Sequence, residues 1–264
     1  MNIPRAFSPI ALLFIVANPT MGEDGWAKLA GPDEPVSPFF FQIPKLSLSY
    51  GQLKHRDGGP EFREDAVVGA IGWEGIFGGM DTFAIDAEFL KTATEETQLT
   101  DTDIWRWGVT GTYLRSSWDR ALRPSELTGT PRFFRAAGGV GAFFRQQVFE
   151  VDTNFGHVER TFDMAGAEAR VDFEAAPRNI LSPFLSLRGG GGWVGVEING
   201  NGDDRVNTGA VLATVEGGIL SQPLWHFEIR GGARYQYLKV FAEDVYSGET
   251  TEMQLIFVEL RFPF

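Results

Sequence analysis

The last eight residues, from Phe257 to Phe264, place an apolar side chain at every second position and end on an aromatic residue, and this pattern most constrains the fold of the chain. Successive side chains of a β-strand point to opposite faces, so the alternation predicts a strand with one apolar and one polar face. The polar face carries Glu259 and Arg261. The apolar face carries Val258, Leu260, Phe262 and Phe264.

Nine earlier stretches alternate in the same way, separated by turn-rich segments at the spacing of long hairpins. The spacing between the stretches is wider than in a soluble sandwich. An even number of antiparallel strands, here ten, can close into a barrel with both ends of the chain on the same side. The sequence therefore predicts an all-β, antiparallel, up-and-down barrel of ten strands, with eight or twelve as the alternatives. The predicted strands are Ile43–Leu53, Asp65–Phe77, Phe83–Phe89, Trp105–Tyr113, Phe134–Gln147, Ala165–Glu174, Leu185–Trp193, Val211–Ile219, Trp225–Tyr237 and Ile256–Phe264.

Composition narrows the function classes. The 32 glycines and the 13% of aromatic residues fit closely packed sheets with ring-bearing surfaces. The chain has no cysteine, which excludes disulfides, thiolate metal sites and a cysteine nucleophile. A net charge of −12 argues against a nucleic-acid partner, since such domains carry a basic patch.

The first residues predict export. Arg5, a short apolar stretch from Ile10 to Ala17, and small residues near Gly22 fit a secretory signal peptide over residues 1–22, which we expect to be cleaved. The stretch is much shorter than the ~20 residues of a spanning helix. Residues 23–42 show no lasting periodicity and predict a periplasmic tether or plug, so the barrel is expected over 43–264.

Alternation alone does not say whether the apolar face meets lipid or a protein core. Placing the strands alternately up and down sorts the aromatic residues into two belts, with Val, Leu, Ala and Gly between them, which favours a membrane-facing surface over a soluble barrel. The polar segments Lys54–Glu64, Thr92–Thr102, Glu150–Glu159, Gly200–Asn207 and Glu243–Glu252 are expected as outer loops. The long connection Ser117–Pro131 is the exception to short inner turns.

The closing strand with its terminal aromatic residue resembles the C-terminal signature of bacterial outer-membrane β-barrel proteins, a broad class. The resemblance implies location in the outer membrane, with outer-membrane lipid and lipopolysaccharide as surroundings and a monomeric state. It also implies that the barrel assembly machinery reads the closing strand. The residues of this assembly signal are Val258, Leu260, Phe262 and Phe264.

The polar face of the predicted strands is expected to line the lumen with charges of both signs. In a barrel of this size, arginine–carboxylate pairs satisfy one another and fill the space. We therefore expect a structural or surface-interaction role with a largely closed lumen, and a narrow porin-like channel for ions or small solutes as the alternative. The expected lumen network is Glu74, Asp86, Glu88, Arg106, Arg135, Arg145, Glu168, Arg170, Asp172, Arg188, Glu216, His226, Glu228, Arg230, Arg234, Glu259 and Arg261.

Motifs for chemistry are absent from the sequence, so no catalytic, metal or cofactor residues are expected. None of His55, His157 and His226 has the preceding Asp of omptin proteases or the His-x-Ser element of outer-membrane lipid hydrolases. The loop Asn199–Asp204 lacks the spaced ligands of a calcium loop, and no Lys-Ser or Lys-Thr follows Gly189–Gly192 as in a phosphate loop. A hydrolase with an unrecognised motif is the third hypothesis, with His157 as its candidate base.

Overall fold

The computed structural model describes residues 40–56, 61–77, 81–93, 100–116, 134–153, 156–175, 181–198, 206–224, 227–243 and 248–262. The predicted signal peptide, nearly all of the predicted tether and the long connection 117–131 lie outside them. No helix in these ranges is long and apolar enough to cross a membrane. The strands are β1 (Phe40–Arg56), β2 (Phe62–Phe77), β3 (Asp81–Ala93), β4 (Thr100–Ser116), β5 (Phe134–Thr153), β6 (Gly156–Ala175), β7 (Leu181–Ile198), β8 (Val206–Leu224), β9 (Phe227–Val240) and β10 (Glu249–Arg261).

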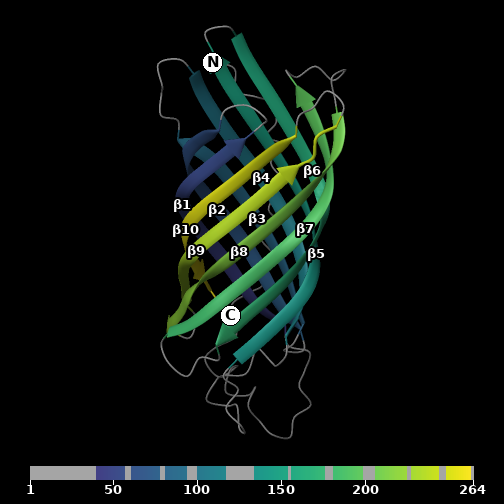
Figure 1. Cartoon of the computed structure of the whole chain (residues 1–264). Coiled ribbons are helices and arrows are strands. Elements are labelled where there is room, and N and C mark those ends of the chain that lie inside the picture. The colour runs from purple at the N-terminus through teal and green to yellow at the C-terminus, as the bar shows by residue number, and fades with distance from the viewer. Residues whose placement is uncertain are drawn as a thin grey trace, which may run out of the picture. The chain divides into compact units, whose positions relative to one another are not determined.

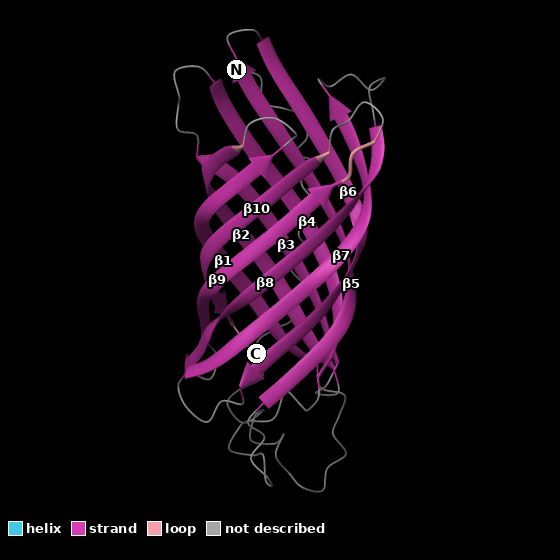
Figure 2. Cartoon of the chain, viewed as in Figure 1, coloured by secondary structure: helices cyan, strands magenta, loops and turns pink. Residues whose placement is uncertain are grey.

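The ten strands form one closed antiparallel barrel (Figure 1). Each strand pairs with its neighbours in sequence, and β1 pairs with β10 to complete the ring. Colouring by secondary structure shows strands all around the wall of the barrel (Figure 2). The sequence prediction of a ten-stranded up-and-down barrel is therefore confirmed. Closure gives every strand a partner on both sides at the middle of the barrel, as hydrocarbon surroundings require.

The pairing register fixes the tilt of the strands. A walk from Pro44 of β1 across successive paired residues, β2 to β10, returns to β1 at Arg56, 12 residues further along the strand. With a rise of ~3.3 Å per residue and a strand spacing of ~4.8 Å, this stagger corresponds to a tilt of about 40°. A barrel of this tilt and strand number is narrow enough for side chains to fill its interior.

Apolar side chains cover the outer surface over the middle of the barrel, as expected. Leu48, Val140 and Ile256 are 63%, 65% and 67% exposed, and Val, Leu, Ile and Ala occupy equivalent positions on the other strands. A continuous apolar band of this kind requires lipid as its solvent.

Aromatic residues end the apolar band at both levels and direct their polar atoms to hydrogen-bond partners. On the outer side, Tyr50 donates to Asp65 at 2.7 Å. Towards the other end, Tyr113 donates to Asp81 at 2.7 Å. On β4, Trp105 and Tyr113 are eight residues apart, which at the strand tilt spans about 20 Å, close to the ~25 Å band of outer-membrane barrels. We call the barrel between the two aromatic levels the membrane zone, and the part beyond the outer level the outer zone.

The strands run further into the outer zone than the sequence predicted. β5 continues to Thr153 and β6 begins at Gly156, so most of the expected loop Glu150–Glu159 is strand. Similarly, β1 extends to Arg56 and β2 starts at Phe62. The polar residues that suggest loops lie on strands. They are accommodated there because the outer face of these strands is in contact with water.

Interior and exterior exchange character between the two zones. In the membrane zone of β6, Glu168 and Arg170 point inward while Ala167 and Ala169 are exposed outside. In its outer zone, Phe162 and Met164 are buried inside on either side of Asp163, which faces outward. The outer zone is thus built like a soluble barrel. Its apolar core, the outer core, consists of Leu53, Ala66, Val68, Leu90, Ile104, Phe143, Phe149, Phe162, Met164, Val194, Val196, Ala210, Leu212, Leu238, Val240, Met253 and Leu255.

Candidate functional site

The polar interior of the membrane zone is the candidate site, and it collects charged residues from most of the strands. Two predicted members are not placed: His226 and the side chain of Arg135 lie outside what the structure describes. The predicted lumen residues found on inward-facing strand positions are Glu74, Asp86, Glu88, Arg106, Arg145, Glu168, Arg170, Asp172, Arg188, Glu216, Glu228, Arg230, Arg234, Glu259 and Arg261.

Arg261 lies at the centre of the periplasmic end of this network. It donates to Glu74 at 2.6 Å and to Glu228 at 3.0 Å, and its Nε lies 3.6 Å from Glu259. Arg261 is 3% exposed and Glu74 is 2% exposed, so the pair is fully removed from water. One planar guanidinium therefore joins carboxylates of β2, β9 and β10 across the β1–β10 closure.

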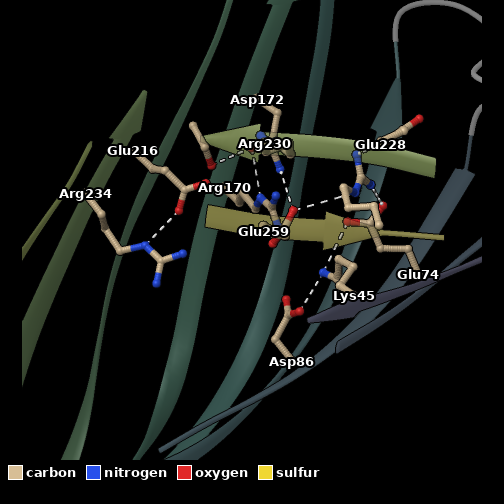
Figure 3. A network of polar contacts seen from close by, with 12 residues as sticks. Lys45, Glu74, Asp86, Arg170, Asp172, Glu216, Glu228, Arg230, Arg234 and Glu259 are labelled. Carbon is tan, nitrogen blue, oxygen red and sulfur yellow. Dashed lines mark hydrogen bonds and ion pairs between the residues drawn. The ribbon is translucent and has the colours of Figure 1, made fainter. Parts of the chain in front are cut away.

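Lys45 is a buried cation of the network that the prediction did not include. Its Nζ lies 2.5 Å from Asp86 and 3.3 Å from Glu74 (Figure 3). Lys45 has the same inward parity on β1 as Ser47 and Ser49, and this parity is the sequence signal that could have identified it.

Further ion pairs fill the middle of the lumen. Arg170 donates to Asp172 at 2.9 Å, and Ser186 donates to the same carboxylate at 2.6 Å. Arg234 donates to Glu216 at 2.8 Å (Figure 3). The Ser186–Asp172 contact joins β6 to β7, and the Arg234–Glu216 contact joins β8 to β9, so both support the strand register from inside the barrel.

Aromatic rings support two of these arginines. Arg230 lies 3.4 Å from Glu259, and its guanidinium carbon is 3.9 Å from the centre of the Phe184 ring. The guanidinium carbon of Arg234 is 5.2 Å from the centre of the Phe257 ring. Stacking of this kind is favourable for arginine when water is excluded.

The upper end of the network is rich in arginine. Arg106 is 2% exposed, lies 3.0 Å from Glu88 and donates to Gln236 at 3.0 Å. Arg145 and Arg188 also act electrostatically on Glu88. This arginine-rich level lies directly beneath the outer core, into which Phe143 projects.

A polar cavity of about 50 Å³ remains among these side chains. A buried water needs roughly 10–15 Å³, so the cavity accommodates only a few water-sized particles. The charged lining comes from Lys45, Asp86, Glu88, Arg145, Arg170, Arg188, Glu216, Arg230, Arg234 and Glu259.

The outer core lies above the cavity and is tightly packed. Leu90, Ile104 and Val194 have no exposed surface, and Phe149 and Phe162 are 2% exposed. This layer is not predicted from the alternation, because alternation assigns one polar inner face to the whole length of each strand. The signal was available, since two adjacent apolar residues such as Leu255 and Ile256 mark the point where the alternation changes phase.

A second missed cluster lies at the outer end of the interior. His55 has no exposed surface, and its Nε2 lies 3.3 Å from Glu249. Its Nδ1 is 3.0 Å from the Thr251 hydroxyl, and Arg160 donates to Glu249 at 3.0 Å. This cluster joins β1, β6 and β10, and its burial against Phe149 denies a substrate access to the imidazole.

Other predicted features are placed as follows. Val258 and Phe262 of the expected assembly signal are exposed on the lipid-facing side, whereas Phe264 lies outside the described residues.

Gly190 and Gly192 lie in mid-strand, where a Cβ would overlap the backbone of β6, so they permit close strand packing. The loop Asn199–Asp204 is not described. No group of three or more His, Asp or Glu residues suited to a metal ion occurs within the described ranges.

No family model matches the sequence, and no curated protein matches it either. Among solved structures, the outer-membrane protease OmpT from Escherichia coli superposes with a TM-score of 0.51 at 10% identity, covering 88% of this chain and 99% of that chain. The translocator domain of the autotransporter NalP from Neisseria meningitidis has a TM-score of 0.49 at 8% identity, covering 91% and 93%. Identities this low establish the fold alone. With its lipid-facing band and aromatic levels, the chain is a bacterial outer-membrane β-barrel protein.

Proposed function

We propose that the protein is a closed, non-conducting barrel with a structural or surface-interaction role and no catalytic activity. The observation that carries the proposal is that two successive layers fill the interior, the arginine–carboxylate network and the outer core. Either layer alone would obstruct a pore of this width, and an ion would lose its hydration in the second.

The outer zone supports a role at the cell surface. A channel gains nothing from an apolar core beyond the membrane, whereas a platform that presents loops to partners needs one to stay rigid. Outward-facing Lys54, Arg56 and Arg63 and the carboxylate of Glu61 give this rim exposed charges of both signs. Such a surface suits polar partners outside the cell, with lipopolysaccharide adjacent to the wall.

Planar-bilayer recording of the purified full-length chain tests the proposal. We expect no steady conductance from the wild type. As a matched control, Arg230→Gln combined with Arg234→Gln should chiefly lower the temperature at which the folded gel band is lost, because it removes the cation paired with Glu216 and one of the two cations near Glu259. Steady wild-type conductance whose ion selectivity changes in this double variant would contradict the closed barrel.

A narrow channel for ions or small solutes is the second candidate, and the polar cavity favours it. It requires the outer core to open. A variant with serine at Leu53, Leu238 and Met253 should conduct if the outer core is the barrier, since these residues are each at most 7% exposed inside it. Under the closed-barrel proposal this variant should remain silent, because the lumen network alone still obstructs the pore.

The proposed lack of enzyme activity is tested separately with His157, which is exposed near the outer end of β6. Wild type and His157→Ala are compared on a panel of lipid and peptide substrates. We expect no turnover by either protein. Turnover that His157→Ala abolishes would replace the structural role with a hydrolase.

A further inference from the structure

Two arginines that line the lumen cavity have no carboxylate partner. The other cations of the lining are all paired: Lys45 with Asp86, Arg170 with Asp172, Arg230 with Glu259 and Arg234 with Glu216. Arg145 and Arg188 form no ion pair or hydrogen bond within the described part of the chain. A buried cation without a partner is costly, which calls for a compensating group.

Arg145 is almost completely buried, with 8% of its surface exposed, and its Nε has no hydrogen-bond partner. Its guanidinium lies 5.5 Å from the Phe143 ring, which supplies no formal negative charge. Glu88, a carboxylate on which Arg145 acts electrostatically, is already paired with Arg106 at 3.0 Å. Arg145 therefore points a largely unsatisfied positive charge at the upper end of the cavity.

Three carboxylates act electrostatically on Arg188, namely Asp86, Glu216 and Glu168. Asp86 is already paired with Lys45 and Glu216 with Arg234, which leaves Glu168. Both of its oxygens are buried without a hydrogen-bond partner, and it does not belong to the cavity lining. It therefore leaves the guanidinium of Arg188 unpaired on the cavity side. Six cations and four carboxylates line the cavity, an excess of two positive charges at its wall.

We propose that this cavity binds a small monovalent inorganic anion of the halide class between Arg145 and Arg188. Thr110, Thr214 and Gln236 also line it and offer neutral hydrogen-bond donors. A volume of about 50 Å³ admits a halide with one or two waters and excludes larger organic anions. The site goes beyond the closed-barrel proposal, since a closed and a conducting lumen can both hold the anion.

The test measures chloride dependence in the full chain folded in detergent. Chloride replaces gluconate at constant ionic strength, and the midpoint temperature of the folded gel band is recorded, because a ligand that binds only the folded state raises that midpoint. Broadening of the chloride-35 NMR signal reports binding directly. We expect both effects in the wild type, and at least a tenfold weaker half-saturation in Arg145→Gln with Arg188→Gln.

Two further variants keep the result decisive. Thr214→Asp places a carboxylate directly opposite Arg188 in the β7–β8 pairing, so it should fold and lose the chloride response even if the arginine variants do not fold. Arg63→Gln removes a cation from the water-exposed rim, outside the cavity, and should retain the response.

The competing explanation is that Arg188 is neutralised by Glu168. Glu168→Gln should then create a chloride response that the wild type lacks, whereas our proposal expects the wild-type response to persist or strengthen. Absence of any response in the wild type, or an unchanged response in both Thr214→Asp and the double arginine variant, would overturn the anion site.

Discussion

In the membrane zone the barrel holds its charges inside and its apolar side chains outside, whereas in the outer zone the same strands hold apolar side chains inside and polar ones outside. On β10 the change falls between Gln254, which faces outward, and Ile256, which is 67% exposed to lipid two residues later. Inside, Met253 and Leu255 give way to Glu259 and Arg261. The outward-facing side chains of each strand therefore match the surrounding solvent, lipid or water. The inward-facing side chains have the opposite polarity.

The two interiors are stabilised by different physics. In the outer core, burial of apolar area contributes about 25 cal/mol per Å² and has no directional requirement such as an ion pair has. In the lumen network, desolvation of each ion opposes the attraction between charges, so the net gain depends on complete pairing. Arg261 forms ion pairs with three carboxylates, whereas Arg145 forms none within the described ranges. The polar zone therefore tolerates ligands and substitutions that the apolar zone rejects.

The largest effect is expected from one carboxylate placed at two positions on β8. Leu212 and Thr214 both point inward and are both 6% exposed, but Leu212 belongs to the outer core. Leu212→Asp loses apolar contacts and buries an unpaired charge, and should cost at least about 4 kcal/mol. Thr214→Asp lies opposite Arg188 and should change stability by less than about 1 kcal/mol. Urea unfolding in lipid vesicles measures both, and equal losses would show that the two interiors do not differ.

An intermediate effect is expected on the outside of β6. Ala169 faces lipid in the membrane zone, while Thr161 lies on the same face in the outer zone. Ala169→Arg should destabilise the barrel by about 2–4 kcal/mol, whereas Thr161→Arg should cost about 0–1 kcal/mol because its charge reaches water. Refolding titrations of the two variants into vesicles supply the comparison. If Ala169→Arg does not lower stability, Ala169 lies outside the membrane zone as defined above.

Strand number, closure and the orientation of the faces could be predicted because each depends on local alternation. Most of the lumen residues followed from the same parity, as Glu216 and Arg234 illustrate. The pairing of charges could not be predicted, since Arg261 meets Glu74 across 187 residues and only the stagger of the closed barrel brings them together. His55 falls in a predicted loop because its polar neighbours Lys54 and Arg56 indicate the end of the strand, whereas β1 continues to Arg56.

The smallest effect is expected at the water-exposed rim, where Glu61 lies between β1 and β2. Contacts with Arg56, Arg63 and Lys54 lower the pKa of its carboxyl group from 4.5 to about 2. Because the folded-state pKa is depressed, the contribution to stability is fully present above pH 4.5 and is lost as the pH falls towards 2. Glu61→Gln should therefore lower the urea midpoint slightly at pH 7, and the difference from wild type should vanish near pH 2.

Asp103→Asn is the matched control for Glu61→Gln, because it removes a rim carboxylate that contacts a single cation, Lys91, at 3.5 Å. Its effect at pH 7 should be smaller still, and 1 M salt should reduce both effects, since screening weakens charges that water reaches. The pairs of the lumen network are shielded from that salt. If 1 M salt changes the stability effect of Glu61→Gln as little as it changes that of a lumen variant, the rim charges are shielded from water. The rim would then not differ from the lumen in its exposure to salt.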